Sequence, residues 1–240
     1  MSESDIDVEM FGNVSKLAGI SAETVNEERA ELARQLDYNR ARLRELADDT
    51  PPLERARVKL DIAESLVALT RGEEAWGLAR EAFNTAMEAE SWQDAVEACN
   101  VLYQAEQPAS IPALGMGIWL AVTFPIDPEL SYTMLDHLVD ETPKNADGAA
   151  LAAVTAKYII DVRANDEQHD SISFLAANLI GRVALRHSNV QTQVGMDVWL
   201  DKLELRDPAI FLPRLGLVVG AIVGEQWWFD RDELRNKIPE

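Results

Sequence analysis

Residues 56–90 read ARVKLDIAESLVALTRGEEAWGLAREAFNTAMEAE, and this stretch indicates the fold of the chain. Its apolar side chains recur three or four residues apart on both sides of a glycine, at Ile62, Ala63 and Leu66 and then at Ala75, Ala79 and Ala82. Residues three or four apart share one face of a helix, so the spacing predicts two amphipathic helices. Gly72 is predicted to end the first helix and Glu73 to open the second. The stretch therefore predicts a closely packed helix pair.

This helix pair resembles a tetratricopeptide repeat, in which small residues let paired helices approach and larger ones fill the groove between neighbours. A further copy begins near Trp92, with Ala98, Cys99 and Leu102 as its matches, so the resemblance covers residues 56–105. It implies a helical-repeat body with a concave surface that binds a protein or peptide, and it implies no catalysis. Any antiparallel helix pair also selects alanine and leucine at such spacings, which leaves a multi-helix bundle as the alternative.

Helical patterns continue on both sides of this pair. Residues 21–48 carry an apolar stripe that includes Leu36 and is interrupted by Arg29 and Asn39. Ser91, Ser110, Asp127 and Asp207 are predicted N-caps, the last three with a proline close behind. Residues 149–162, 172–185 and 209–223 are apolar on most faces, which is typical of central helices. No apolar-polar alternation marks a strand, so the sequence predicts an all-α fold of about ten to eleven helices, either helical-repeat-like or a multi-helix bundle.

The acidic start of the chain is predicted to differ from the remainder. Residues 1–20 carry Glu3, Asp5, Asp7 and Glu9 before a short apolar set, so this segment is expected to be disordered or loosely docked. Residues 21–240 are expected to form a single all-helical domain with the repeat-like part at 56–105. The chain opens without a basic and then apolar leader, which favours a cytoplasmic location.

Charge narrows the classes of partner. The chain has 42 acidic and 22 basic residues, a formal net charge of −20. Such a charge repels nucleic-acid phosphates and anionic membrane surfaces, so we expect neither as a partner. A protein partner with a basic surface fits better, although solubility alone also explains the charge. The sequence carries no signal for an oligomeric state.

No motif for catalysis, for a cofactor or for a metal occurs at diagnostic spacing. Cys99 lies in an apolar helical pattern and is expected to be a buried structural thiol. His137 is expected on a solvated helix face near Asp140, and His187 near a helix end. His169 falls in DEQHD, expected to be a loop that leads to a cap at Asp170 or Ser171. We therefore expect no cofactor and no metal, and catalysis is disfavoured.

Two features near the C-terminus have alternative interpretations. Gly216, Gly220 and Gly224 form one small-residue stripe on a helix, which predicts a buried crossing with another helix. Trp227 and Trp228 are adjacent aromatic residues, expected to pack back over the core or else to anchor a partner.

The leading hypothesis is a non-enzymatic protein-interaction protein, such as an adaptor, assembly factor or regulator. If the repeat resemblance holds, Lys59 and Ser65 are exposed and border the partner groove, and Trp227 and Trp228 form the alternative contact. A first rival is an enzyme or small-molecule binder with a pocket between central helices. A second rival is an acidic mimic of nucleic acid that blocks a DNA-binding protein.

Overall fold

The computed structural model describes residues 22–238, and this part of the chain is helical throughout. Its 11 helices make up 78% of it and it contains no strand, which confirms the all-α prediction. In chain order they are α2 (Ala22–Glu45), α3 (Pro52–Ala68), α4 (Gly72–Glu88), α5 (Trp92–Gln104), α6 (Ser110–Thr123), α7 (Pro128–Glu141), α8 (Asp147–Arg163), α9 (Asp166–Ser188), α10 (Gln193–Lys202), α11 (Pro208–Val223) and α12 (Arg231–Arg235). The acidic segment predicted at residues 1–20 lies outside the described residues.

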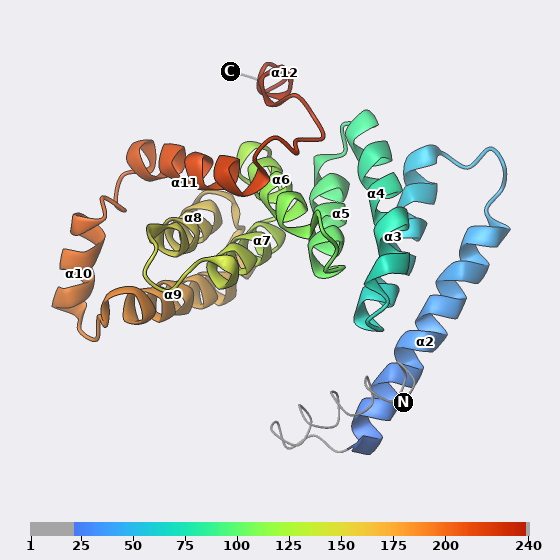
Figure 1. Ribbon diagram of the computed structural model, residues 1–240, viewed down its shortest axis with the longest axis horizontal. Helices are drawn as coiled ribbons and strands as arrows, with labels where there is room; N and C mark the ends of the chain where they lie inside the picture. The colour runs from blue at the N-terminus through green and yellow to red at the C-terminus, as the bar shows by residue number, and fades with distance from the viewer. Residues whose placement is uncertain (1–21, 239–240) are drawn as a thin grey trace.

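The helices from α3 to α9 form two layers, because each packs against the next along the chain. Helices α3, α5, α7 and α9 are successive neighbours in one layer, and α4, α6 and α8 lie in the other. Helix α11 returns to pack on α6 and α8, while the first turns of α2 project away from the body (Figure 1). This order places the ends of α3, α5 and α7 along one edge of the molecule.

Close packing between the helices depends on alanine. Ala63, Ala75, Ala79, Ala95 and Ala98 are completely buried, as the apolar spacing predicted for most of them. Small side chains at these positions allow neighbouring helix backbones to approach, and larger ones then fill the space around them. Leu66 and Phe83 are the largest buried side chains of α3 and α4.

The turn between α3 and α4 differs from the prediction. Gly72 does not end α3; it is the first residue of α4, and Thr70 supplies the left-handed conformation with φ 60°. Glycine is needed at position 72 for another reason: a Cβ atom there would lie 2.1 Å from the Ala105 carbonyl oxygen. Gly72 therefore allows the start of α4 to touch the end of α5.

The predicted N-caps are correct where an aspartate precedes a proline. The Asp127 side chain accepts hydrogen bonds from the amides of Glu129 and Leu130, and Asp207 accepts one from Ala209. Ser91 instead donates its hydroxyl to Asp94, so its predicted cap bond is absent. The carboxylate of Asp94, in the first turn of α5, is the partner of this hydroxyl, and the pair is a charge-assisted hydrogen bond.

Ser110 is the first residue of α6 and not its N-cap. Its hydroxyl donates to the Leu102 carbonyl at 2.6 Å and accepts from the Gln107 amide at 2.9 Å. The side chain is thereby used to join the end of α5 to the start of α6. Because its hydroxyl is directed at α5 and Gln107, Ser110 does not accept a hydrogen bond from the amides in the first turn of α6.

The loop predicted around DEQHD is wrong. Asn165 caps α9 by accepting from the Gln168 amide, and the helix begins at Asp166, so His169 lies within its first turns. An N-cap asparagine followed by acidic residues is a favourable helix start, because the acids interact with the helix dipole.

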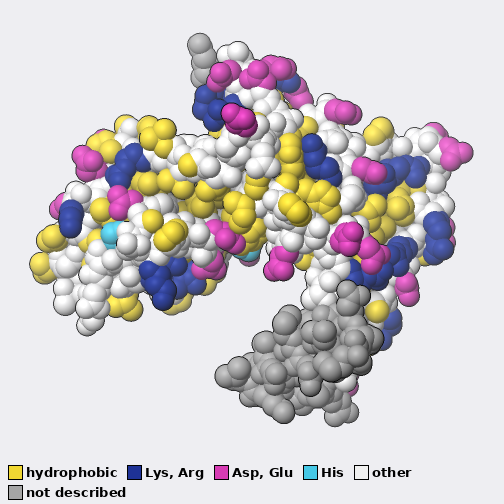
Figure 2. Space-filling model, viewed as in Figure 1, with side chains coloured by type: hydrophobic (Ala, Val, Ile, Leu, Met, Phe, Trp, Pro, Cys, Tyr) yellow, Lys and Arg dark blue, Asp and Glu magenta, His cyan; other side chains and the backbone are white. Residues whose placement is uncertain are grey.

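The glycine stripe of α11 does not form the predicted buried crossing. A Cβ atom at Gly216 or Gly220 would meet nothing within 4 Å, and the neighbouring Leu217 is 75% exposed. Leu215, Val219 and Val223 form the buried face instead. Because α11 is apolar on almost every side, only the packing partner decides which side is covered. Figure 2 shows apolar side chains gathered at the upper left, where α11 lies in Figure 1.

The C-terminal aromatic residues pack back over the core. The Trp228 ring meets Phe83 edge-on, with ring centroids 5.3 Å apart, and Trp227 meets Trp119 at 6.3 Å. The Arg80 guanidinium lies 3.9 Å from the centroid of the Trp228 ring, a cation–π contact. These contacts fix the segment after α11 against α4 and α6.

Candidate functional site

Three adjoining hollows form a groove along the edge where α3, α5 and α7 end and α4, α6 and α8 begin. The middle hollow has a volume of about 510 Å³ and the one beside α4 about 390 Å³. The third, beside α11, has about 310 Å³. Val67, Gln104, Glu106 and Gln107 line both of the first two hollows, and Ile111 and Glu141 line both the middle and the third. The hollows therefore make one continuous groove.

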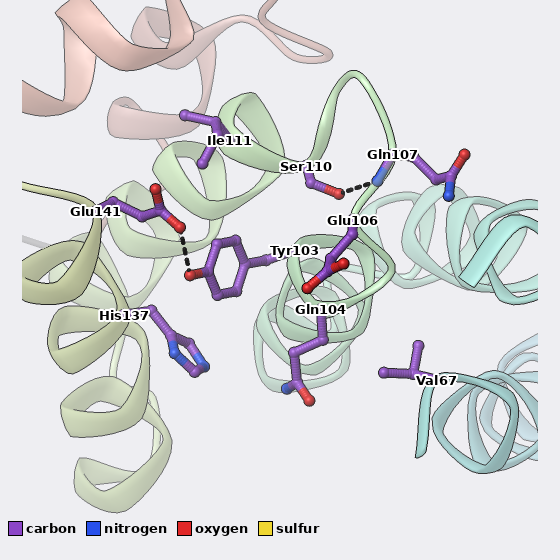
Figure 3. Close-up of a pocket in the computed structure, with 9 residues that line it drawn as sticks. All are labelled: Val67, Tyr103, Gln104, Glu106, Gln107, Ser110, Ile111, His137 and Glu141. Atoms are coloured by element: carbon purple, nitrogen blue, oxygen red, sulfur yellow. Dashed lines mark hydrogen bonds between the residues drawn. The ribbon is translucent and has the colours of Figure 1, made fainter. Parts of the chain in front are cut away.

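Aromatic rings and a carboxylate organise the middle hollow (Figure 3). The Tyr103 hydroxyl on α5 donates to Glu141 Oε1 on α7 at 2.7 Å. The His137 ring lies against Tyr103 with ring centroids 4.6 Å apart, and His137 Nε2 donates to Asn100 Oδ1 at 3.1 Å. Helices α5 and α7 are thus held at a fixed separation by contacts between these side chains.

The groove is negatively charged. Glu73, Glu106 and Glu141 line it, and none of the described residues that line the three hollows is Lys or Arg. Burial lowers the pKa of His137, so this ring is neutral at neutral pH and adds no positive charge. Burial and the contact with Glu141 raise the pKa of Tyr103, which keeps its hydroxyl as a hydrogen-bond donor. A cation is the charge that fits this site.

The end of the groove beside α11 is apolar. Leu114 and Leu138 are fully buried at its floor, and Val218 and Ile222 of α11 form one wall together with Ala146, the residue before α8. Pro143 and Gly148 also line it, and its polar residues are Glu141 and Thr142. Along its length, the groove therefore passes from acidic to apolar.

None of the four predicted site residues lines the groove. Lys59 is half-buried and not exposed as expected, and its Nζ forms an ion pair with Glu81 Oε2 at 2.6 Å. The expectation that Ser65 is exposed is wrong, since it is 6% exposed and donates its hydroxyl to the Asp61 carbonyl. Helix α3 packs against three helices, α2, α4 and α5. Less of its surface is therefore open than if it packed against a single neighbouring helix. Trp227 and Trp228 pack on the core as described above.

The histidines occupy different positions from those expected. His137 does not lie on a solvated face; it is half-buried between α7 and α5, where it lines the middle hollow. His187 lies near the end of α9 as predicted, with Nε2 3.3 Å from Asp147 Oδ1. Its Nδ1 accepts a hydrogen bond from Trp199. Cys99 is completely buried, and burial raises the pKa of its thiol, as expected for a structural residue.

Tyr103, Glu106 and Glu141 are site residues that the sequence interpretation missed. Tyr103 and Glu141 are 38 residues apart, so no spacing motif connects them. Glu106 follows α5 with φ 52°, a conformation that glycine usually adopts, and its sequence gives no sign of this. A polar pair such as Glu106 and Gln107 after an apolar helix reads simply as a surface turn.

Within residues 22–238, no group of three or more His, Cys, Asp or Glu side chains is placed to hold a metal ion. In the same range, none of the helices has both the length and the apolar character that crossing a bilayer requires. Comparison with protein-family models, with curated proteins and with solved structures finds no match to this chain.

Proposed function

We propose that this chain is a non-enzymatic protein-interaction protein, an adaptor, assembly factor or regulator, that holds a segment of a protein partner in the groove. The groove itself carries this proposal. It crosses the ends of six consecutive helices and α11, so its lining is long and open at the surface. An extended chain segment fits such a shape better than a compact small molecule, whose sites are concave and enclose most of the ligand.

The charge of the groove favours a partner segment with lysine or arginine. Three glutamates line the groove, and the chain as a whole has a formal net charge of −20. The overall field would accelerate encounter with a basic partner, and the local carboxylates would select its orientation. The tetratricopeptide resemblance, which stays a prediction, implies the same class of function.

Charge reversal in the groove tests this proposal. The wild-type chain is used to capture partners from its native cells, and the affinity of a purified captured protein is measured by isothermal titration calorimetry. The variant Glu73→Lys/Glu106→Lys is expected to weaken binding at least about tenfold, because two attractive contacts become repulsive. Within residues 22–238 neither side chain forms a hydrogen bond or an ion pair, so folding should be retained.

The matched control is Glu88→Lys/Glu225→Lys, which changes the net charge equally at two exposed residues outside the groove. It is expected to change the affinity by no more than about twofold at physiological salt, where charges beyond a Debye length are screened. Equal weakening by both double variants would reject the groove as the contact. An affinity that neither double variant changes would also reject the groove as the contact.

A further inference from the structure

The two ends of the groove have different chemistry, and this difference specifies what a partner must carry. The end beside α4 is lined by Glu73 and Glu106 together with the amides of Gln104 and Gln107. The end beside α11 is lined by aliphatic side chains, with Leu114 and Leu138 at its floor. A segment that lies along the whole groove therefore meets carboxylates at one end and hydrocarbon at the other.

The apolar end can enclose one side chain. Its volume of about 310 Å³ is bounded by α6, α7, α8 and α11, so an inserted group would be surrounded from several sides. Ile111 is 37% exposed at its mouth, while Val218 and Ile222 are half-buried. Burying one Leu-sized or Phe-sized side chain contributes roughly tenfold to a hundredfold in affinity. This hollow is thus suited to a single anchor residue.

The acidic end fits cations. Glu73, in the first turn of α4, and Glu106, after α5, are exposed, and the Tyr103 ring lines the adjoining hollow. A guanidinium or ammonium group here would interact with carboxylates and with an aromatic ring at the same time. His137, neutral because burial lowers its pKa, does not oppose it.

Resting on the proposed function, we infer that the partner segment is bipartite: one large apolar side chain occupies the hollow beside α11, and lysine or arginine side chains occupy the acidic end. Ile111 and Glu141 line both the apolar and the middle hollows, and Gln104 and Glu106 both the middle and the acidic ones. Because the hollows share these walls, one continuous segment spans them, with the anchor and the basic residues at a fixed separation in sequence.

A random dodecapeptide library displayed on phage tests this inference with the full chain as the target. Enriched peptides are expected to carry one large apolar residue and two or more basic residues at a constant separation. The affinity of the best synthetic peptide is then measured for groove variants. Val218→Lys places an ammonium group in the apolar hollow and should weaken binding at least about tenfold. Ala146→Phe, which fills the same hollow, should have a similar effect.

The matched control lies one residue away on the same helix. Leu217 is 75% exposed on the solvent side of α11 and does not line the hollow, so Leu217→Lys should change the affinity no more than about twofold. At the acidic end, Glu73→Gln/Glu106→Gln should remove the selection for basic residues but keep the apolar anchor. Circular dichroism and thermal melts confirm that each variant is folded.

The outcomes separate this inference from the proposed function. Basic peptides without a recurring apolar residue, or peptides that bind Val218→Lys and Ala146→Phe as tightly as wild type, would overturn the bipartite segment while leaving a protein-binding groove. If no enriched peptide depends on Glu73 and Glu106, both the bipartite segment and the basic-partner groove are wrong.

Discussion

At the scale of single residues, the chain uses conformations that its side chains do not favour. Among residues 22–238, five non-glycine residues have positive φ, each just after the end of a helix: Thr70, Glu90, Glu106, Asn189 and Glu204. Glycine or asparagine usually occupies this position, because a Cβ atom is strained there. Only Asn189 is of a favoured type.

We predict that Glu204→Gly stabilises the protein. Glu204 has φ 54°, and the amide of Leu205 donates to the Leu200 carbonyl in the helix-ending turn. Relief of the left-handed strain should raise the free energy of unfolding by about 1 kcal/mol. Urea denaturation measures the change. Glu204→Ala is the control and should give no comparable gain, because alanine keeps its Cβ; an equal gain would contradict the explanation by strain.

A charged pair between α3 and α5 makes the free energy of unfolding depend on pH. Arg57 donates from Nε and Nη2 to the two carboxylate oxygens of Asp94, each at 2.8 Å, and Ser91 donates to the same carboxylate. Burial raises the pKa of Asp94, but the hydrogen bonds from Arg57 and Ser91 outweigh it and leave the pKa lowered. The ionised form therefore stabilises the fold.

We predict that Asp94→Asn destabilises the protein at neutral pH and much less in acid. The cost should be about 1 kcal/mol at pH 7, modest because the Arg57 side chain is 56% exposed and water replaces part of the contact. The wild-type advantage is full above the unfolded pKa of about 3.9 and disappears as the pH falls through the lowered folded pKa. Urea denaturation at several pH values between about 7 and 2 measures it. A difference that stays constant across this range would contradict the assignment.

At the scale of elements, α4 contains two glycines with opposite roles. Gly72 lies against the end of α5, where a Cβ atom would meet the Ala105 carbonyl oxygen at 2.1 Å. Gly77 lies in the same helix on its exposed side, and a Cβ atom there would meet nothing within 4 Å. Contact between α4 and α5 therefore requires glycine only at the first position.

We predict opposite effects for alanine at these two glycines. Gly77→Ala should raise the free energy of unfolding by about 0.5–1 kcal/mol, because alanine loses less entropy when the helix forms. Gly72→Ala should lower it by about 1–3 kcal/mol, because the backbones of α4 and α5 must separate. Thermal and urea unfolding of the two variants provide the measurement. A stabilised Gly72→Ala would show that α4 and α5 do not meet as closely as described.

Across the whole molecule, the chain after α11 covers the layer of helices that contains α4 and α6. Trp228 contacts Trp76 and Phe83 of α4, and Trp227 contacts Trp119 of α6. Lys237 beyond α12 forms an ion pair with Glu90 after α4, 2.7 Å apart. The last described residues are thereby connected to α4 and α6, and the tryptophans are used for packing.

We predict that Trp228→Ala destabilises the protein without affecting a groove-bound partner. The cost should be about 2–4 kcal/mol, somewhat below that of a fully buried tryptophan because this ring is half-buried. Thermal unfolding measures stability, and titration with a captured partner below the melting transition measures affinity. A large loss of affinity with little loss of stability would instead identify the tryptophans as a partner contact.

Local patterns in the sequence are sufficient to indicate the helices of this protein. Apolar residues at three- and four-residue steps, aspartates before prolines and the alanine positions of residues 56–90 depend on contacts within one or two turns. They predicted the all-α class, the approximate number of helices and the burial of Leu66 and Cys99, all of which the structure contains. A helix forms from local hydrogen bonds, so local sequence is sufficient to indicate it.

Which face of α11 is covered and where the groove lies depend on how the helices pack in space. Helix α11 is apolar around most of its surface, so only its packing on α6 and α8 distinguishes buried Val219 from exposed Leu217. The groove joins Val67 of α3 to Ile222 of α11 through Tyr103 and Glu141. Residues so distant in sequence meet only after the helices have packed. The apolar periodicity of a helix shows which of its residues share a face, but it does not specify how that helix is oriented relative to other helices.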